Sequence, residues 1–160
     1  MKSQLTWAVL ALGIVLAQHS QAEEKLLVQA VLDPKVHVVD AVKRECALDG
    51  MVGNFVLESV GKKYRGATRL DQGASAGKSR LLKVTIINVV GVGGGAYSGP
   101  KSMTVRADLL EAGKVIATTT KERTSGGGAF GGMKGTCSIF GRVAKTLGSD
   151  VAGWLPSAMK

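Results

Sequence analysis

Residues 101–124 read KSMTVRADLL EAGK VIATTTKERT, and they carry the strongest structural signal in this chain of 160 residues. In the first ten of them apolar and polar side chains alternate, which is the period of a strand with one buried face. The EAGK segment is a tight-turn sequence, and the last ten residues form a second strand whose threonines and charges suit solvent. The stretch therefore predicts a β-hairpin. Its polar face would hold Ser102, Thr104, Arg106 and Asp108, and its buried face Met103, Val105, Ala107 and Leu109.

Two more strands are predicted upstream of the hairpin. Residues 81–90 are rich in branched side chains, which favour a strand. Residues 25–32 form a short apolar run that is typical of a strand or an extended arm. Residues 35–42 fit either a further strand or a turn into a helix, and the polar, glycine-containing residues 65–79 are expected to form a loop.

Two segments have the three- and four-residue spacing of an amphipathic helix. The first extends from Leu48 to about Gly61, where Lys62 and Lys63 would face the negative end of the helix dipole. The second extends from about Thr136 to Leu155. Its apolar stripe consists of Phe140, Val143, Ala144, Leu147, Val151 and Trp154.

The predicted order is strand, helix, three strands, helix, and it indicates the α+β class. Two amphipathic helices must bury their stripes, and a sheet with one apolar face provides the partner surface. We therefore expect a two-layer sandwich of a three- to four-stranded, mainly antiparallel sheet with two helices packed on one face. One domain over residues 23–160 accounts for all of these elements.

Residues 1–22 have the order of a secretory signal peptide. Lys2 is followed by an uncharged run from Leu5 to Ala17, and Ser20-Gln21-Ala22 places small residues at the cleavage site. The run of 13 residues is too short to cross a hydrocarbon core of about 30 Å as a helix. The sequence therefore predicts a periplasmic or secreted protein without a transmembrane segment after cleavage.

The mature chain is expected to be strongly basic. Lys2 is the only charged residue of the signal segment, so the net charge falls from +9 to +8 on cleavage. Outside the cytoplasm such a charge favours an anionic envelope polymer or lipid or an envelope protein as the partner, with no nucleic acid expected, although a well-solvated surface explains it equally. The candidate contacts are the cluster after the first helix and a lysine at a glycine-rich helix N-terminus: Lys62, Lys63, Arg65 and Lys134. Tyr97, in the other glycine-rich loop, is a candidate contact with a partner.

Cys46 and Cys137 are predicted to form a structural disulfide, because an even cysteine count in an oxidising compartment favours pairing. Each lies near the beginning of a predicted helix, so helices packed side by side would bring the thiols together. Two thiols and one mature histidine, His37, have no usual metal-ligand spacing, so neither a metal site nor another cofactor is expected.

The sequence offers little support for an enzyme. GASAGKS at residues 73–79 has three residues between its glycines where a phosphate-binding loop needs four, and it precedes a predicted strand. The glycines at 93–95 are likewise followed by a strand, where a dinucleotide site needs a helix. A histidine-based triad would have to form around His37 alone, and no serine lies in a Gly-x-Ser-x-Gly turn. We therefore expect no catalytic residue.

Four features together are similar to a group of small exported bacterial proteins of unknown function. They are the signal peptide, the strand ending in GVGGG at 91–95, the hairpin with its LEAGK turn at 110–114, and the amphipathic C-terminal helix. These proteins are often lipoproteins, and the likeness extends over residues 80–155 to the periplasmic domain of the curli-secretion lipoprotein. This chain lacks the lipid-bearing cysteine, since its first cysteine is Cys46. The resemblance implies no catalytic residue.

Export, basic charge and this resemblance predict a soluble periplasmic accessory or binding protein. It would act by surface recognition of an envelope protein or an anionic envelope component. A secreted inhibitor or effector-type protein is the alternative, and an envelope hydrolase is the third hypothesis. The sequence leaves the oligomeric state open.

The first testable prediction is that the mature protein begins at Glu23. The small residues Ser20 and Ala22 fit the −3 and −1 positions that signal peptidase requires. N-terminal sequencing or intact-mass measurement of exported protein checks this. Envelope material that still begins at Met1 or Lys2 would contradict it.

Overall fold

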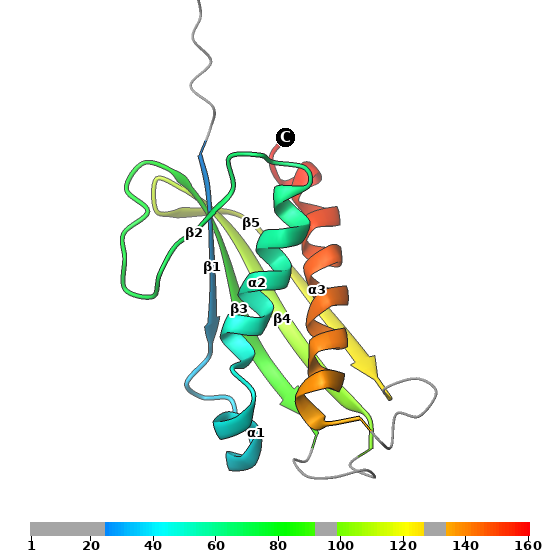
Figure 1. Ribbon diagram of the computed structural model, residues 1–160. Coiled ribbons are helices and arrows are strands. Elements are labelled where there is room, and N and C mark those ends of the chain that lie inside the picture. Colours follow the sequence, from blue (N-terminus) through cyan, green and yellow to red (C-terminus); the bar gives the residue numbers. More distant parts are fainter. Residues whose placement is uncertain (1–24, 92–98, 127–133) are drawn as a thin grey trace, which may run out of the picture.

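A five-stranded sheet with two long helices on one face forms the described part of the chain (Figure 1). The structure is a computed structural model and describes residues 25–91, 99–126 and 134–160. The elements in chain order are β1 (Leu26–Leu32), α1 (Asp40–Glu45), α2 (Leu48–Gly61), β2 (Thr68–Arg69), β3 (Arg80–Val90), β4 (Lys101–Glu111), β5 (Lys114–Ser125) and α3 (Thr136–Ala158).

The sheet has the order β2-β1-β3-β4-β5 and is mixed. Strands β3, β4 and β5 are antiparallel neighbours, whereas β1 is parallel to both β3 and β2. The α+β class is therefore confirmed, and the expected three- to four-stranded, mainly antiparallel sheet is close but not exact, because the sheet has five strands and β1 pairs in parallel. The reason is the long connection between β1 and β3. It contains α1 and α2, and a helical connection of this length returns the chain to start a parallel strand.

The β4–β5 hairpin has the alternation predicted from the sequence. Met103, Val105, Ala107 and Leu109 are fully buried beneath the helices. On the other face, Asp108 is also buried. Its carboxylate accepts hydrogen bonds from Arg106 Nε at 3.1 Å and from Thr118 Oγ1 at 2.8 Å, and these bonds offset the cost of burying its charge.

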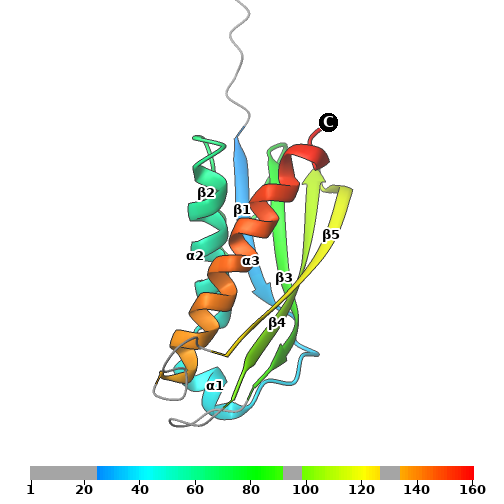
Figure 2. The same ribbon diagram turned by 90° about the vertical axis from the view of Figure 1, so that its right-hand side faces the viewer.

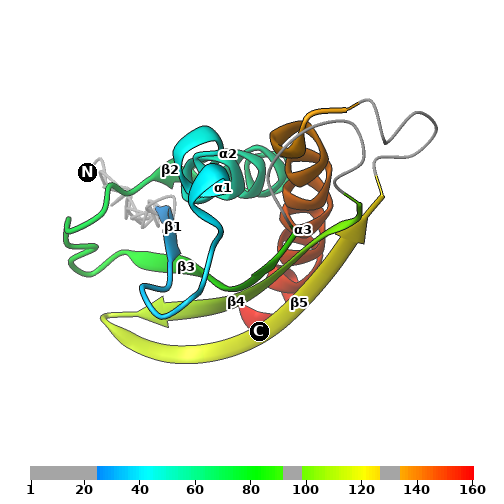
Figure 3. The same cartoon turned by 90° about the horizontal axis from the view of Figure 1, so that it is seen from below.

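The helices α2 and α3 pack side by side against the same face of the sheet, as Figure 3 shows for the curved sheet seen from below. The predicted stripe of α3 is buried, with Trp154 partly so, and Val52, Val56 and Val60 of α2 are fully buried. A third helix, α1, was not predicted. It begins at Asp40, inside the segment that fitted either a strand or a turn into a helix, and it has only six residues. Strand β2 lies within the expected loop.

A disulfide joins the beginnings of the two long helices. Cys46 follows α1 directly, Cys137 is the second residue of α3, and their Cα atoms are 5.3 Å apart. Cys46 is buried in the hydrophobic core. The bond therefore holds the first turns of α2 and α3 next to each other.

The two helices come into close backbone contact at a glycine of α3. A Cβ atom on Gly148 would lie 2.6 Å from the carbonyl oxygen of Phe55 and 3.0 Å from the backbone nitrogen of Val56. Real Cβ contacts are longer, and backbone atoms cannot move aside as a side-chain tip can. Only glycine therefore allows this helix spacing.

We predict that Gly148→Ala destabilises the fold by about 1–3 kcal/mol, because the added methyl group overpacks the helix interface. Gly153→Ala in the same helix is the matched control, since a Cβ there meets nothing within 4 Å and alanine favours a helix. Urea unfolding of both variants measures the difference. Equal stability of the two variants would show that the helices are not in backbone contact.

We also predict that replacing Cys46 or Cys137 with serine lowers the free energy of unfolding by about 2–5 kcal/mol. The bond closes a long loop, and its loss frees the unfolded chain. Non-reducing peptide mapping of periplasmic protein should yield one cross-linked pair, and denaturation with and without reductant gives the stability. Two freely alkylatable thiols would refute the bond.

Candidate functional site

One end of the molecule gathers several chain segments that are far apart in sequence. Strands β1 and β3 begin there, β4 ends there, and both long helices finish there (Figures 1 and 2). The segment that follows α2, residues 62–67, lies at the same end. Residues from the start of the chain, its middle and its C-terminus are thereby brought together.

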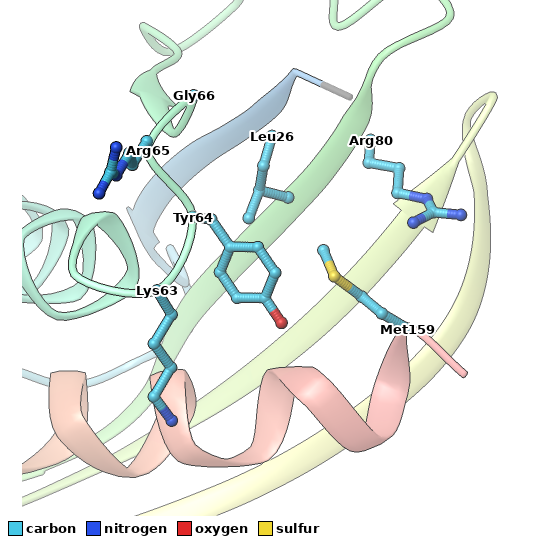
Figure 4. Close-up of a pocket in the computed structure, with 7 residues that line it drawn as sticks. All are labelled: Leu26, Lys63, Tyr64, Arg65, Gly66, Arg80 and Met159. Atoms are coloured by element: carbon cyan, nitrogen blue, oxygen red, sulfur yellow. The ribbon is translucent and has the colours of Figure 1, made fainter. Parts of the chain in front are cut away.

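A pocket of about 400 Å³ opens between these segments. Figure 4 shows the ring of Tyr64 beside Leu26 and Met159, with basic side chains around this apolar group. Leu26 is buried, while Tyr64 and Met159 are half-buried and retain exposed surface. The residues that line the pocket are Leu26, Lys63, Tyr64, Arg65, Gly66, Arg80 and Met159.

The three basic residues of the pocket differ in their present partners. Lys63 donates from Nζ to the backbone carbonyl of Ala152 on α3 at 3.2 Å, and Arg80 forms an ion pair with Glu111 at 2.9 Å. Arg65 is exposed, and its guanidinium points away from the Tyr64 ring (Figure 4). An ammonium has three donors and a guanidinium five, so Lys63 and Arg65 can both add a bond to an anion.

The positive surface continues from the pocket along the end of α2. Lys62 follows the last residue of this helix and pairs with Glu58 at 3.0 Å. The hydrogen bond from Lys62 and its positive charge lower the pKa of the Glu58 carboxyl. A second hollow of about 200 Å³ between α2 and α3 is lined by Ser59, Lys62, Lys63, Ser149 and Ala152. The two hollows share Lys63.

We call this surface the basic end. Its cations are Lys25, Lys62, Lys63, Arg65, Arg80, Lys114 and Lys160. Part of this charge has a structural task, because α2 and α3 run in the same direction and bring two negative dipole ends to one place. Lysines beside those helix ends offset the repulsion. Lys63 also donates to the carbonyl of Ala152, which lacks its usual intrahelical donor because Pro156, four residues later, has no N–H.

The structure separates the predicted contact residues into two groups. Lys62, Lys63 and Arg65 lie together at the basic end, but Lys134 precedes the first residue of α3 at the other end. The helix between them has 23 residues, a length of about 34 Å. Lys134 therefore cannot share a small ligand with the other three. Tyr97 lies outside the described residues.

A buried lysine marks the end opposite the basic end. Lys101 is fully buried at the start of β4, donates to the carbonyl of Gly99 at 3.1 Å, and has its pKa lowered by burial. Its aliphatic stem packs on Gly91, where a Cβ would clash with it and where φ is +142°. Glycine at this position therefore makes room for the lysine.

The described residues contain no cluster of metal-ligating side chains. Within residues 25–91, 99–126 and 134–160, no three His, Cys, Asp or Glu side chains group together as metal ligands. His37 is exposed in the connection between β1 and α1. In the same ranges no helix has both the length and the apolar character needed to cross a membrane.

Comparison with solved structures finds this fold in bacterial proteins. Protein XCC0632 from Xanthomonas campestris, of the DUF330 family, matches with a TM-score of 0.52 and 14% identity over 87% of each chain. PelC from Paraburkholderia phytofirmans, a dodecamer, matches with a TM-score of 0.50 and 15% identity over 79% of this chain and 86% of its own. A minor lipoprotein from Acinetobacter baumannii matches with a TM-score of 0.40 and 11% identity over 86% and 95%. No family model and no curated protein matches the sequence. At these identities XCC0632 and PelC share the fold alone.

Proposed function

We propose that this chain is an exported envelope protein that acts by binding, and that its basic end recognises an anionic envelope component. The observation that carries the proposal is that Lys63, Arg65 and Arg80 all line one pocket. These cations come from two different segments of the chain and meet only in the folded protein.

One observation supports export, beside the predicted signal segment. The two cysteines form a disulfide, a bond that persists mainly in oxidising compartments. The fold is shared with XCC0632, and the likeness to small exported proteins and to the curli-secretion lipoprotein stays a prediction.

The pocket favours a binding role over plain solubility. Cations spread evenly over a surface keep a protein dissolved, but they do not need to surround a hollow with apolar walls. An exposed ion pair contributes only about 0–1 kcal/mol, so an anion is held well only where several cations and a recess act together. The basic end offers both.

The test compares two charge-matched double variants. Lys62→Gln/Arg65→Gln removes two charges from the basic end. Lys35→Gln/Arg44→Gln removes two exposed charges from α1 and the connection before it, at the opposite end of the molecule. Binding to purified anionic cell-wall polymer and to anionic vesicles is measured by co-sedimentation over a salt series. We predict that the first variant loses about 5- to 30-fold in affinity, since each exposed charge contact contributes roughly 0.5–1 kcal/mol.

The control variant should keep its affinity within about twofold, and the binding of both should weaken with salt because exposed charges are screened. Equal losses in the two variants would mean that net charge alone attracts the anion. Absence of binding to polymer and vesicles at low salt would remove the proposed function.

A further inference from the structure

We propose that the pocket at the basic end takes an amphiphilic anion, namely the phosphate headgroup of an anionic phospholipid together with the first part of its acyl chains. This inference rests on the proposed function and names the ligand class of the same site. The ligand is identified by the pairing of cations with an apolar wall in one pocket of about 400 Å³.

The apolar wall distinguishes a lipid from a simple polyanion. Tyr64 and Met159 are half-buried and keep part of the ring and thioether exposed inside the pocket. A wall polymer or free phosphate would leave these surfaces in water, whereas glycerol and methylene groups would cover them. Tyrosine also suits a membrane interface, since its ring is apolar and its hydroxyl is polar.

The cations lie around that wall, and the Arg65 guanidinium, which points away from the Tyr64 ring in this structure, must turn toward the pocket to hold the phosphate. Arg65 and Lys63 leave α2 on one side of the pocket, and Arg80 begins β3 on the other (Figure 4). A guanidinium matches the oxygens of a phosphate with two parallel hydrogen bonds, so Arg65 is the principal headgroup contact. Lys63 keeps two donors beyond its bond to Ala152.

The surrounding charges would orient the molecule on a membrane. Lys25 and Lys114 are exposed at the same end but do not line the pocket. Basic residues near an anionic lipid surface attract the protein to it over about one Debye length. The basic end would thus face the headgroups before the pocket engages one of them.

The experiment uses three soluble probes and calorimetry on the mature protein. Dihexanoyl phosphatidylglycerol below its micelle concentration has both chemical parts, glycerol 3-phosphate has only the anion, and dihexanoyl phosphatidylcholine has the chains without net charge. We expect phosphatidylglycerol to bind at least about tenfold more tightly than either of the others, because only this probe contacts both the cations and the apolar wall of the pocket.

Variants assign the effect to the pocket. Met159→Gln should reduce the advantage of phosphatidylglycerol over glycerol 3-phosphate, and Arg65→Gln should weaken the binding of both anions by about 2- to 5-fold. Lys114→Gln is the matched control, since it removes one charge from the basic end outside the pocket and should change soluble-probe binding by less than twofold. Thermal unfolding verifies that each variant is folded.

Each unfavourable outcome has a distinct meaning. Equal affinity for phosphatidylglycerol and glycerol 3-phosphate would overturn the lipid inference and leave an anion site. Binding to wall polymer with no response to any lipid probe would also overturn it while preserving the proposed function. Absence of binding to every anion, polymer included, would remove both.

Discussion

The contact between Gly148 and the backbone of Phe55 is the constraint on which the helical layer depends. It sets the distance between α2 and α3. Two further contacts join the same pair of helices, one on each side of this glycine. The disulfide lies at one end, and the bond from Lys63 to the carbonyl of Ala152 lies toward the other. The three contacts occur in the same sequence order along both helices, so α2 and α3 are parallel neighbours.

Parallel packing explains why positive charge collects where it does. Two helix dipoles that point the same way place their negative ends together, and this arrangement is unfavourable without nearby cations. Lys62 and Lys63 supply that charge. The same geometry brings the segment after α2 against β1 and the end of α3, so that Tyr64 meets Leu26 and Met159. Lys63 therefore belongs both to the charge beside the helix ends and to the proposed binding pocket.

Local periodicity predicted the elements well, because the hairpin and both long helices bury a repeating face. It did not predict the sheet order, since the parallel pairing of β1 with β3 depends on a distant segment and leaves no trace in residues 26–32. The six residues of α1 are too few to show a helical period.

The sequence predicted some residues of the site but not others. The adjacent cations Lys62, Lys63 and Arg65 stand out as a cluster, but Arg80 and Met159 join them only through the fold. Lys134 has similar chemistry in the sequence, yet the length of α3 separates it from the others. The burial of Lys101 was also unforeseen, because a lysine at the edge of an alternating run is expected in solvent.

The central claim is that the segments at the ends of the two parallel helices form an anion-binding pocket with the starts of β1 and β3. Mapping of backbone amide shifts by NMR, during titration with a short-chain anionic phospholipid, tests it most directly. The account predicts that the largest changes fall on residues 63–66, Arg80 and Met159, with residues 134–140 at the far end of α3 unaffected. Largest changes around Lys134, or small changes spread evenly over the surface, would contradict it.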